Sequence, residues 1–441
     1  MQQSLASLEA EGLQAFVIAD DVCSDIQRAA TVIDWTREPW LLLVRAGDEL
    51  APGAAALYRE AIAGTSADVV YADDDTLGLL GQRKSPYFKP SWNAELYQHY
   101  DYLRGACILR VHEDDVTDAA EAQDWVKALT ERAIAARKSA HHVKAVLHHR
   151  RSRIVPDLPP KALEIARDLP SLSVIIPTRN RADLLSKCIE GLQATRYPSL
   201  DVVVVDNDSD EPAALELLEA LQSRGVRVLR HPGAFNYSAI NNRAVDEARG
   251  ELICLLNNDI EVLEPDWLEI MATQAMRDDV GAVGAKLLYP DGRLQHAGVV
   301  IGVGNAAGHA HRFLRPTDEG YFFRHSLPQY VSAVTDACLV VRRDRVGAAG
   351  GVAPDGVPVA FNDVDLCMKL NELGWQSLFE PRAVLIHHES VSRGHDHDPV
   401  GAARFEGELA ALQRRWKTDC IVDPYHHPQL SRASEQFAVF V

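Results

Sequence analysis

The sequence predicts an α/β protein organised around a doubly wound, mostly parallel sheet. From residue 172 onward, short apolar runs alternate with amphipathic stretches. This pattern is typical of βαβ units, because parallel strands are buried on both faces. Several apolar runs also end abruptly in polar residues, as expected of the sheet edge where α/β proteins bind ligands. The first expected strands are 172–176, 201–205, 226–229 and 252–256, and the first expected helices are 181–194, 211–223 and 237–248.

The rest of the chain is less regular. Apolar segments follow at 281–288, 298–303 and 331–342, and a helix is expected at 365–373. A last helix is expected at 402–416, where an apolar stripe indicates an amphipathic helix with one buried face.

Length and composition exclude several classes of protein. The 441 residues allow two or three domains, and a net charge of −18 without a dense Lys/Arg cluster excludes nucleic acid as the expected partner. Seven scattered cysteines without a CxxC pair predict free thiols in a reducing compartment. The chain shows no leader pattern and no apolar run of roughly 18 residues. We therefore expect a cytoplasmic protein without a transmembrane segment, attached at most peripherally to the inner face of the plasma membrane.

Four regions are expected along the chain. Residues 1–150 form a first α/β domain, and the charged, proline-rich segment 151–171 is a linker. Residues 172–398 form the main domain, and 399–441 form a C-terminal helix and tail.

The first domain is a fainter copy of part of the second. Five segments match in the same order, among them the one that places Asp48 opposite Asp259. The first copy has no counterpart of residues 173–180, so it lacks the opening strand and the polar loop behind it. We therefore expect a truncated, non-catalytic domain.

The strand expected at 252–256 ends in Asn257, Asn258 and Asp259. A carboxylate beyond the carboxyl end of a buried strand is well placed to hold a divalent cation against a phosphate. The alternative is a turn rich in Asn and Asp with no further role.

Two further loops lie at expected strand ends. Residues 177–181 follow the first strand and Asp206–Ser209 follow the second, where acceptor groups suit a ribose or a base edge. Neither loop is a P-loop or a GxGxxG turn, so the common phosphate-binding loops do not apply. Each loop by itself also fits an ordinary turn.

Acidic residues and histidines later in the chain complete the candidate site. After the Gly/Pro-rich loop 350–358, Asp363 is the candidate general base and Asp365 is expected to be the N-cap of the following helix. The alternative for Asp363 is a second capping carboxylate. His387 ends an apolar run and is a candidate nitrogen ligand for the cation at Asp259. Residues 296, 309 and 311 are histidines expected in loops, without a metal role.

Together these motifs resemble the family 2 glycosyltransferases, which have the GT-A fold with a Rossmann-like nucleotide-binding half. The similarity is greatest to the bacterial branch that builds surface polysaccharide and O-antigen, with many rhamnosyltransferase-like members. The first domain resembles the partial, degenerate GT-A-like domain often found upstream in such proteins. The matching segments are 173–181, 205–209, 235–242, 255–261, 281–292, 361–366 and 387–394.

The resemblance implies roles for individual residues. Asp363 is the general base, and Asp259 binds Mn²⁺ or Mg²⁺ with help from His387. Asn257 stands where the family commonly has Asp, so it offers the cation a neutral amide oxygen at most. The residues implied in binding the nucleotide sugar are Pro177, Thr178, Arg179, Asn180, Arg181, Asp206, Asn207, Asn242, Asn258 and Lys286.

The expected function is inverting transfer of a hexosyl or deoxyhexosyl group. The donor is a nucleotide-diphosphate sugar, and the acceptor is a glycan or a lipid-linked glycan. A sugar nucleotidyltransferase is disfavoured because 173–181 lacks a Gly-rich, Arg-bearing loop. Two alternatives stay open: a non-catalytic sugar-nucleotide-binding or scaffold protein of a polysaccharide assembly complex, and a polysaccharide-binding module. The latter would use aromatic residues of the first domain that also suit core packing, namely Tyr87, Phe88, Trp92, Tyr97, Tyr100 and Tyr102.

Overall fold

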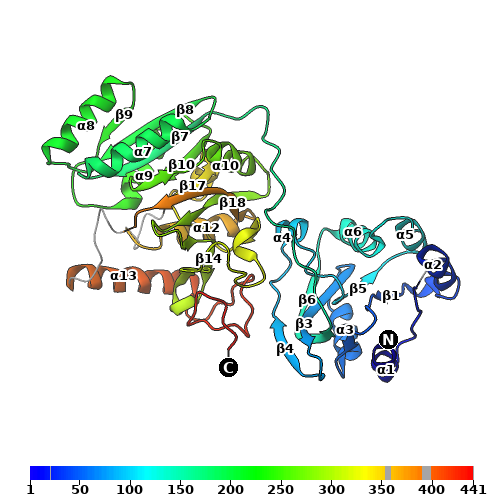
Figure 1. Ribbon diagram of the computed structural model, residues 1–441. Helices are drawn as coiled ribbons and strands as arrows, with labels where there is room; N and C mark the ends of the chain where they lie inside the picture. The colour runs from blue at the N-terminus through cyan, green and yellow to red at the C-terminus, as the bar shows by residue number, and fades with distance from the viewer. Residues whose placement is uncertain (20, 353–358, 390–398, 441) are drawn as a thin grey trace. The chain divides into compact units, whose positions relative to one another are not determined.

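The computed structural model describes residues 1–19, 21–352, 359–389 and 399–440. The chain divides into two compact units, Met1–Asp157 and Leu158–Val441 (Figure 1). Residues 390–394 of the last family-like motif and 353–358 of the Gly/Pro-rich loop lie outside the described residues.

The second unit contains a ten-stranded sheet whose main path is β11-β18-β12-β17-β10-β7-β8-β9. Strands β9, β8, β7 and β10 run parallel to one another, and β12 runs parallel to β18. Strand β17 lies antiparallel between β10 and β12. The predicted doubly wound, mostly parallel sheet is therefore confirmed, with antiparallel strands added in its second half. The strands of this unit are β7 (Leu172–Thr178), β8 (Leu200–Asp206), β9 (Arg227–Arg230), β10 (Leu252–Leu256), β11 (Ile260–Val262), β12 (Val280–Leu288), β13 (Leu294–His296), β14 (Val299–Ile301), β15 (Ala307–His309), β16 (Gln329–Val331), β17 (Cys338–Arg342) and β18 (Gln376–His387).

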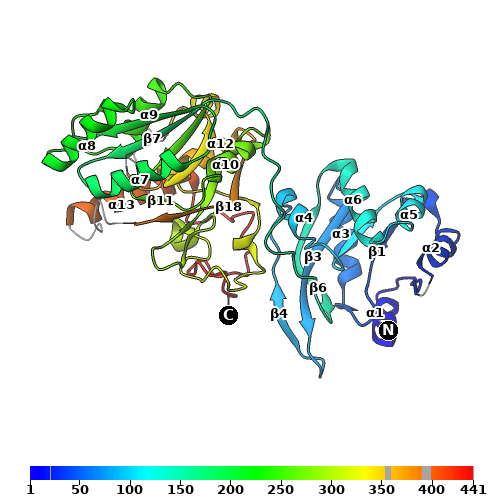
Figure 2. The ribbon, with the colours of Figure 1, turned by 45° about the horizontal axis from the view of Figure 1, so that its top comes forward.

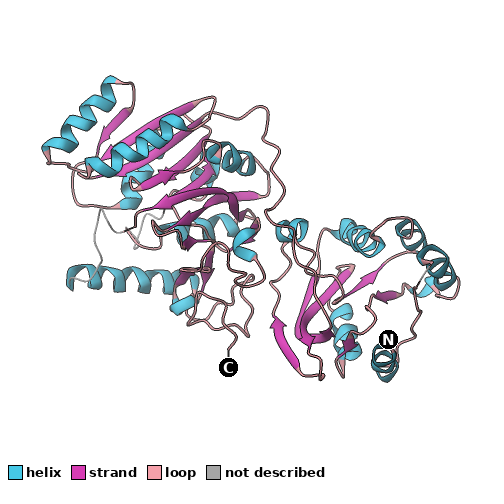
Figure 3. Cartoon of the chain, viewed as in Figure 1, coloured by secondary structure: helices cyan, strands magenta, loops and turns pink. Residues whose placement is uncertain are grey.

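Helices cover both faces of this sheet. Alternate residues of a strand face opposite sides, and one hydrophobic cluster joins Ile253 and Leu255 of β10 to Ile240 of α9, Leu370 of α12 and Trp416 of α13. On the other face, α10 contacts β12, β17 and β18. Figures 2 and 3 show the alternation of strands and helices. The helices are α7 (Ala182–Ala194), α8 (Pro212–Ser223), α9 (Tyr237–Glu247), α10 (Trp267–Ala275), α11 (Arg343–Ala348), α12 (Asn362–Glu372) and α13 (Pro399–Trp416), with 3-10 turns η2 (Val303–Asn305) and η3 (Arg324–Ser326).

The sheet of the first unit repeats half of the second. Its order, β1-β5-β3-β6-β2, has the same sequence of antiparallel and parallel pairings as β10-β17-β12-β18-β11. The register agrees as well, since Trp40 pairs with Arg110 as Leu252 pairs with Arg342. Among the described residues of this unit nothing corresponds to β7, β8 and β9. The predicted partial copy is therefore confirmed. Its strands are β1 (Trp40–Leu42), β2 (Glu49–Leu50), β3 (Val69–Leu77), β4 (Arg83–Tyr87), β5 (Cys107–Arg110) and β6 (His141–Arg150).

The aromatic residues of the first unit belong mostly to its interior. Tyr87, Tyr97, Tyr100 and Tyr102 are buried, which supports core packing rather than an exposed glycan-binding surface. The helices of this unit are α1 (Gln2–Ala10), α2 (Val22–Ala30), α3 (Ala54–Ala63), α4 (Ala94–His99), α5 (Glu113–Ala119) and α6 (Trp125–Arg137), with the 3-10 turn η1 (Trp35–Arg37).

The apolar segment 331–342 contains the end of β16 and all of β17, which pair with different neighbours and are separated by a loop. One prediction about an element boundary is wrong. Helix α12 begins at Asn362, and its N-cap is Phe361 in the left-handed region (φ 61°). Asp365 is therefore not an N-cap. It is buried within the helix, where it accepts a hydrogen bond from Trp416 Nε1 (2.9 Å) and pairs with Lys369 (3.2 Å).

Within the described parts of the chain, all seven cysteines are free thiols. No described helix is both long enough and apolar enough to cross a membrane.

Candidate functional site

Three loops meet at the carboxyl edge of the parallel strands in the second unit. Strands β7 and β8 are in register, with Thr178 opposite Asp206. The backbone N–H of Asn207 donates to the carbonyl of Thr178 (2.9 Å), and Asn258 Nδ2 donates to Thr178 Oγ1 (3.0 Å). The polar residues after β7, β8 and β10 therefore form one continuous edge.

The loop after β7 is held in shape by Asn180. Its side-chain oxygen accepts from the backbone N–H groups of Asp210 and Glu211, and its Nδ2 donates to Asp210. Arg181 forms a two-bond ion pair with Asp183. This pairing raises the pKa of Arg181, and the charge of Asp259 adds to the effect. Asn180 thus shapes the loop, while Arg181 brings a cation near Asp259.

The other predicted residues of this loop differ in exposure. Pro177 is half-buried, Thr178 is buried and Arg179 is exposed.

The two polar residues after β8 are already engaged. Asp206 is buried, pairs with Arg230, and accepts from the N–H of Ser209 (3.3 Å). Asn207 donates to the carbonyls of His231 (2.8 Å) and Gly233 (3.0 Å). Both side chains therefore order the loop around residues 206–233.

Asp259, His387 and Asn257 form a compact set of possible metal ligands. The pairing of β11 with β18 sets Ile260 opposite His387. His387 Nε2 consequently lies 3.1 Å from Asp259 Oδ1 and 3.4 Å from Asn257 Nδ2. Asp259 is only 4% exposed. Burial acts to raise its pKa, but the neighbouring His387 ring outweighs burial, so the net pKa is lowered.

These three side chains fit a divalent cation. Although Asp259 Oδ1 lies close to His387, no well-oriented donor among the described residues reaches this buried oxygen. A buried carboxylate oxygen without a donor, an imidazole nitrogen and an amide oxygen are suitable ligands for Mn²⁺ or Mg²⁺. Rotation of the Asn257 amide would present its oxygen.

Asp363 lies in the first turn of α12, half-buried. Its Oδ1 accepts from the N–H of Val364 (2.8 Å) and its Oδ2 from the N–H of Asp336 (3.4 Å). The next residue, Ala337, accepts from the N–H of Asn257 (3.0 Å). A single loop therefore joins Asp363 to the metal-ligand set. Burial raises the pKa of Asp363, against the lowering effect of its hydrogen bonds and of nearby His309, and a raised pKa favours a general base.

Lys286 extends from β12 and is only 8% exposed. Desolvation lowers its pKa to about 8. Its charge contributes to the lowered pKa values of His311 and His325, after burial as the main cause, so Lys286 lies near these rings.

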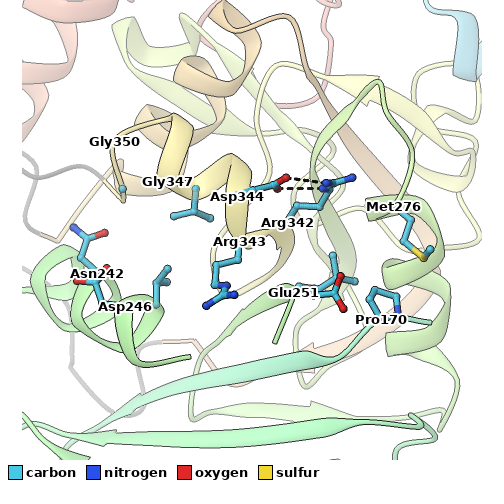
Figure 4. Close-up of a pocket in the computed structure, with 14 residues that line it drawn as sticks. Pro170, Asn242, Asp246, Glu251, Met276, Arg342, Arg343, Asp344, Gly347 and Gly350 are labelled. Atoms are coloured by element: carbon cyan, nitrogen blue, oxygen red, sulfur yellow. Dashed lines mark hydrogen bonds and ion pairs between the residues drawn. The ribbon is translucent and has the colours of Figure 1, made fainter. Parts of the chain in front are cut away.

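Asn242 is not brought to this edge. Its side chain exchanges two hydrogen bonds with the backbone of Val352 (2.7 and 2.8 Å). It lines a cavity of about 980 Å³ together with Glu251, Arg342 and Asp344 (Figure 4). Because Leu252 and Arg342 also line it, this cavity lies at the opposite end of β10 from Asp259. This cavity and the candidate site are therefore different places.

The copy in the first unit has a different arrangement. Asp48, which corresponds to Asp259, accepts from the N–H of Arg151 (2.7 Å) and lies 3.7 Å from Nε of the buried Arg150. His149 corresponds to His387, because it pairs with Glu49 as His387 pairs with Ile260, and its Nδ1 lies 2.7 Å from Oδ1 of Asp75 rather than beside Asp48. An internal guanidinium thus lies beside the carboxylate that corresponds to the metal ligand.

Three contributors were missed by sequence reasoning. Arg230 pairs with Asp206, His309 lies near Asp363, and Gln295 contacts both His309 and His387. The sequence predicts that the histidines at 296, 309 and 311 lie in loops. In fact His296 ends β13 and His309 ends β15. Their positions depend on pairing between distant segments, which no local pattern shows.

The fold and site define an α/β domain with acidic and polar side chains gathered at the carboxyl edge of its parallel strands. Residues 173–344 match the family model described as glycosyl transferase family 2, so this part of the chain is a family 2 glycosyltransferase domain.

Two curated relatives match almost the whole chain. An uncharacterized protein, y4gI, of Sinorhizobium fredii is 36% identical over 94% of this chain and 51% of its own length. The O-antigen biosynthesis protein RfbC of Myxococcus xanthus is 33% identical over 88% of this chain and 33% of its own length. The chain thus spans about half, or less, of these relatives. Among solved structures, a mannosyltransferase of Pyrobaculum calidifontis in complex with GDP-Man and Mn²⁺ gives a TM-score of 0.43 at 18% identity, covering 61% of this chain and 71% of that one.

Proposed function

We propose that residues 172–398 form an inverting glycosyltransferase of cell-surface polysaccharide biosynthesis. It moves a hexosyl or deoxyhexosyl group from a nucleotide-diphosphate sugar to a glycan or lipid-linked glycan. The observation that carries this proposal is the Asp259–His387 pair, joined through one loop to Asp363, with a buried Asp259 oxygen that no donor of the described residues reaches in good orientation. The name of the Myxococcus xanthus relative supports the O-antigen class of acceptor. The proposed reaction takes place in the cytoplasm, and at the inner face of the plasma membrane where the acceptor is lipid-linked.

Each side chain has a defined task in the proposed reaction. The loops around Thr178, Asp206 and Asn258 border the nucleotide, and Lys286 offers a cation to a phosphate. A divalent cation bound by Asp259, His387 and Asn257 would supply charge neutralisation on the diphosphate leaving group. A carboxylate oxygen of Asp363 takes the proton of the acceptor hydroxyl, whose oxygen attacks the anomeric carbon from the opposite face. A single displacement of this kind inverts the anomeric centre.

The first unit is proposed to be non-catalytic. Its carboxylate at Asp48 already has Arg150 and Arg151 beside it, and it has no described counterpart of the nucleotide-binding strands. Its role would be to support the second unit or to contact other components of the assembly machinery.

A donor screen tests the proposal. The chain is incubated with Mn²⁺ or Mg²⁺ and a panel of UDP-, dTDP- and GDP-sugars, and release of the nucleoside diphosphate is measured. We expect slow, metal-dependent hydrolysis of one donor, lost in Asp259→Ala and reduced roughly 10²–10⁴-fold in Asp363→Asn. Asp344→Asn, at the cavity on the far end of β10, is the matched control and keeps the activity. Absence of both release and donor binding would favour a scaffold protein.

A further inference from the structure

One buried glutamine contacts two of the histidines near the site. Gln295, on β13, is 2% exposed. Its Oε1 lies 2.8 Å from His387 Nδ1, and its main-chain oxygen lies 3.0 Å from His309 Nδ1. His387 faces Asp259, and His309 lies near Asp363. Gln295 thus connects the surroundings of the proposed metal ligand and the proposed base.

The orientation of the Gln295 amide follows from its other partner. Gln295 Nε2 lies 3.0 Å from Glu389 Oε2, and Glu389 is itself held by Arg312 (3.2 Å). An ionised carboxylate only accepts hydrogen bonds, so the NH₂ group must face Glu389. The carbonyl oxygen Oε1 therefore faces His387.

This orientation fixes the protonation pattern of the His387 ring. An amide oxygen cannot donate, so His387 Nδ1 must carry the hydrogen of that contact. In the neutral ring Nε2 then has a free lone pair, directed to the place where Asp259 Oδ1 lies 3.1 Å away. Two acceptors at this distance repel each other unless a positive charge lies between them. The neutral Nδ1–H tautomer therefore suits cation binding at Nε2.

We propose that Gln295 is a positioning residue that holds His387 in the Nδ1–H tautomer and so keeps Nε2 available as a ligand for the divalent cation. The inference rests on the proposed function, because it assigns Gln295 a place behind the proposed metal site. Partners of this kind orient a ligating imidazole, and their loss weakens metal binding roughly 10–100-fold.

The test uses the full-length chain and two readouts that need no sugar donor. Mn²⁺ affinity is measured by calorimetry, and histidine tautomers are measured by long-range ¹⁵N NMR on metal-free protein labelled at histidine. Gln295→Leu removes the acceptor, whereas Gln295→Glu keeps it. Gln274→Leu is the matched control, since Gln274 is equally buried and donates to Glu380 Oε2 (2.9 Å). His309 is an internal reference, because its acceptor is the main chain and survives every substitution.

The expected result is specific to one ring. Gln295→Leu weakens Mn²⁺ binding roughly 10–100-fold and moves His387 away from the Nδ1–H form, while the His309 signals stay unchanged. Gln295→Glu and Gln274→Leu keep the Mn²⁺ affinity within a few-fold. If Gln295→Leu does not fold, Glu389→Leu at the exposed rim frees the amide to rotate and lowers the affinity in the same direction.

Two results would overturn the inference. The first is a tautomer measurement that does not find His387 in the Nδ1–H form in the wild-type protein, or that finds the same tautomer in Gln295→Leu. The other is an equal loss of Mn²⁺ affinity in Gln274→Leu, which would indicate a general packing effect. A wild-type chain that binds no Mn²⁺ contradicts the proposed metal-assisted reaction, and the tautomer measurement still decides the role of Gln295.

Discussion

Replacing Lys286 with methionine should stabilise the protein at neutral pH. Lys286 is only 8% exposed, and desolvation lowers its pKa from the ordinary value of 10.5 to about 8. A shift of this size corresponds to roughly 3 kcal/mol of unfavourable free energy for the charged form in the folded state. A methionine has a similar length and no charge, so it avoids this cost.

The pH dependence identifies the cause. Between pH 8 and 10.5 the unfolded chain holds the lysine proton more tightly than the folded chain does. The wild-type protein therefore becomes more stable as the pH rises through this range. The advantage of Lys286→Met is therefore complete below about pH 8. This stability advantage falls to less than half of its full size by about pH 9.5, and it vanishes above the pKa of the lysine in the unfolded chain.

Urea unfolding of wild type and variant at pH 7 and pH 9.5 measures this difference. Lys144→Met, at an exposed lysine, is the control and should change stability little at either pH. A destabilised Lys286→Met, or a stability difference that does not change with pH, would refute the reasoning. The same variant should bind the nucleotide-sugar donor more weakly, because in our proposal the charge is kept for a donor phosphate.

Four further outcomes are expected from the structure. Gly250→Ala should destabilise by about 1–3 kcal/mol in urea unfolding, because its Cβ would lie 2.3 Å from the backbone nitrogen of Ser173. Gly407→Ala, on the exposed side of α13 with nothing within 4 Å, should instead stabilise by about 1 kcal/mol. Asp365→Ala should lower the unfolding free energy by about 3–5 kcal/mol because it leaves the buried Lys369 without its carboxylate; an unchanged thermal midpoint would contradict this. Calorimetry with Mn²⁺ at about 100 times its Kd should show roughly 2.7 kcal/mol of stabilisation in wild type and none in Asp259→Ala.

The sequence by itself determined the framework of the second unit. Strong alternation between buried strands and amphipathic helices placed β7 to β10 and α7 to α9 within a few residues, because these elements are local and regular. The internal copy was also readable, since it depends on segments that match in order. The family 2 domain could be recognised from the motifs that lie at the ends of those same strands.

Tertiary structure decided what depends on contacts between distant segments. The pairing of β11 with β18 brings His387 to Asp259, and Gln295 enters only because β13 folds beside them. Asp365 looked like a helix cap, yet the chain turns at Phe361 and buries Asp365 against Trp416 of a helix much later in the chain. Asn242 lies in a family-like motif, but its amide binds Val352 away from Asp259. Local patterns report periodicity and turns, whereas these partners are selected by long-range pairing and by the need to satisfy buried polar groups.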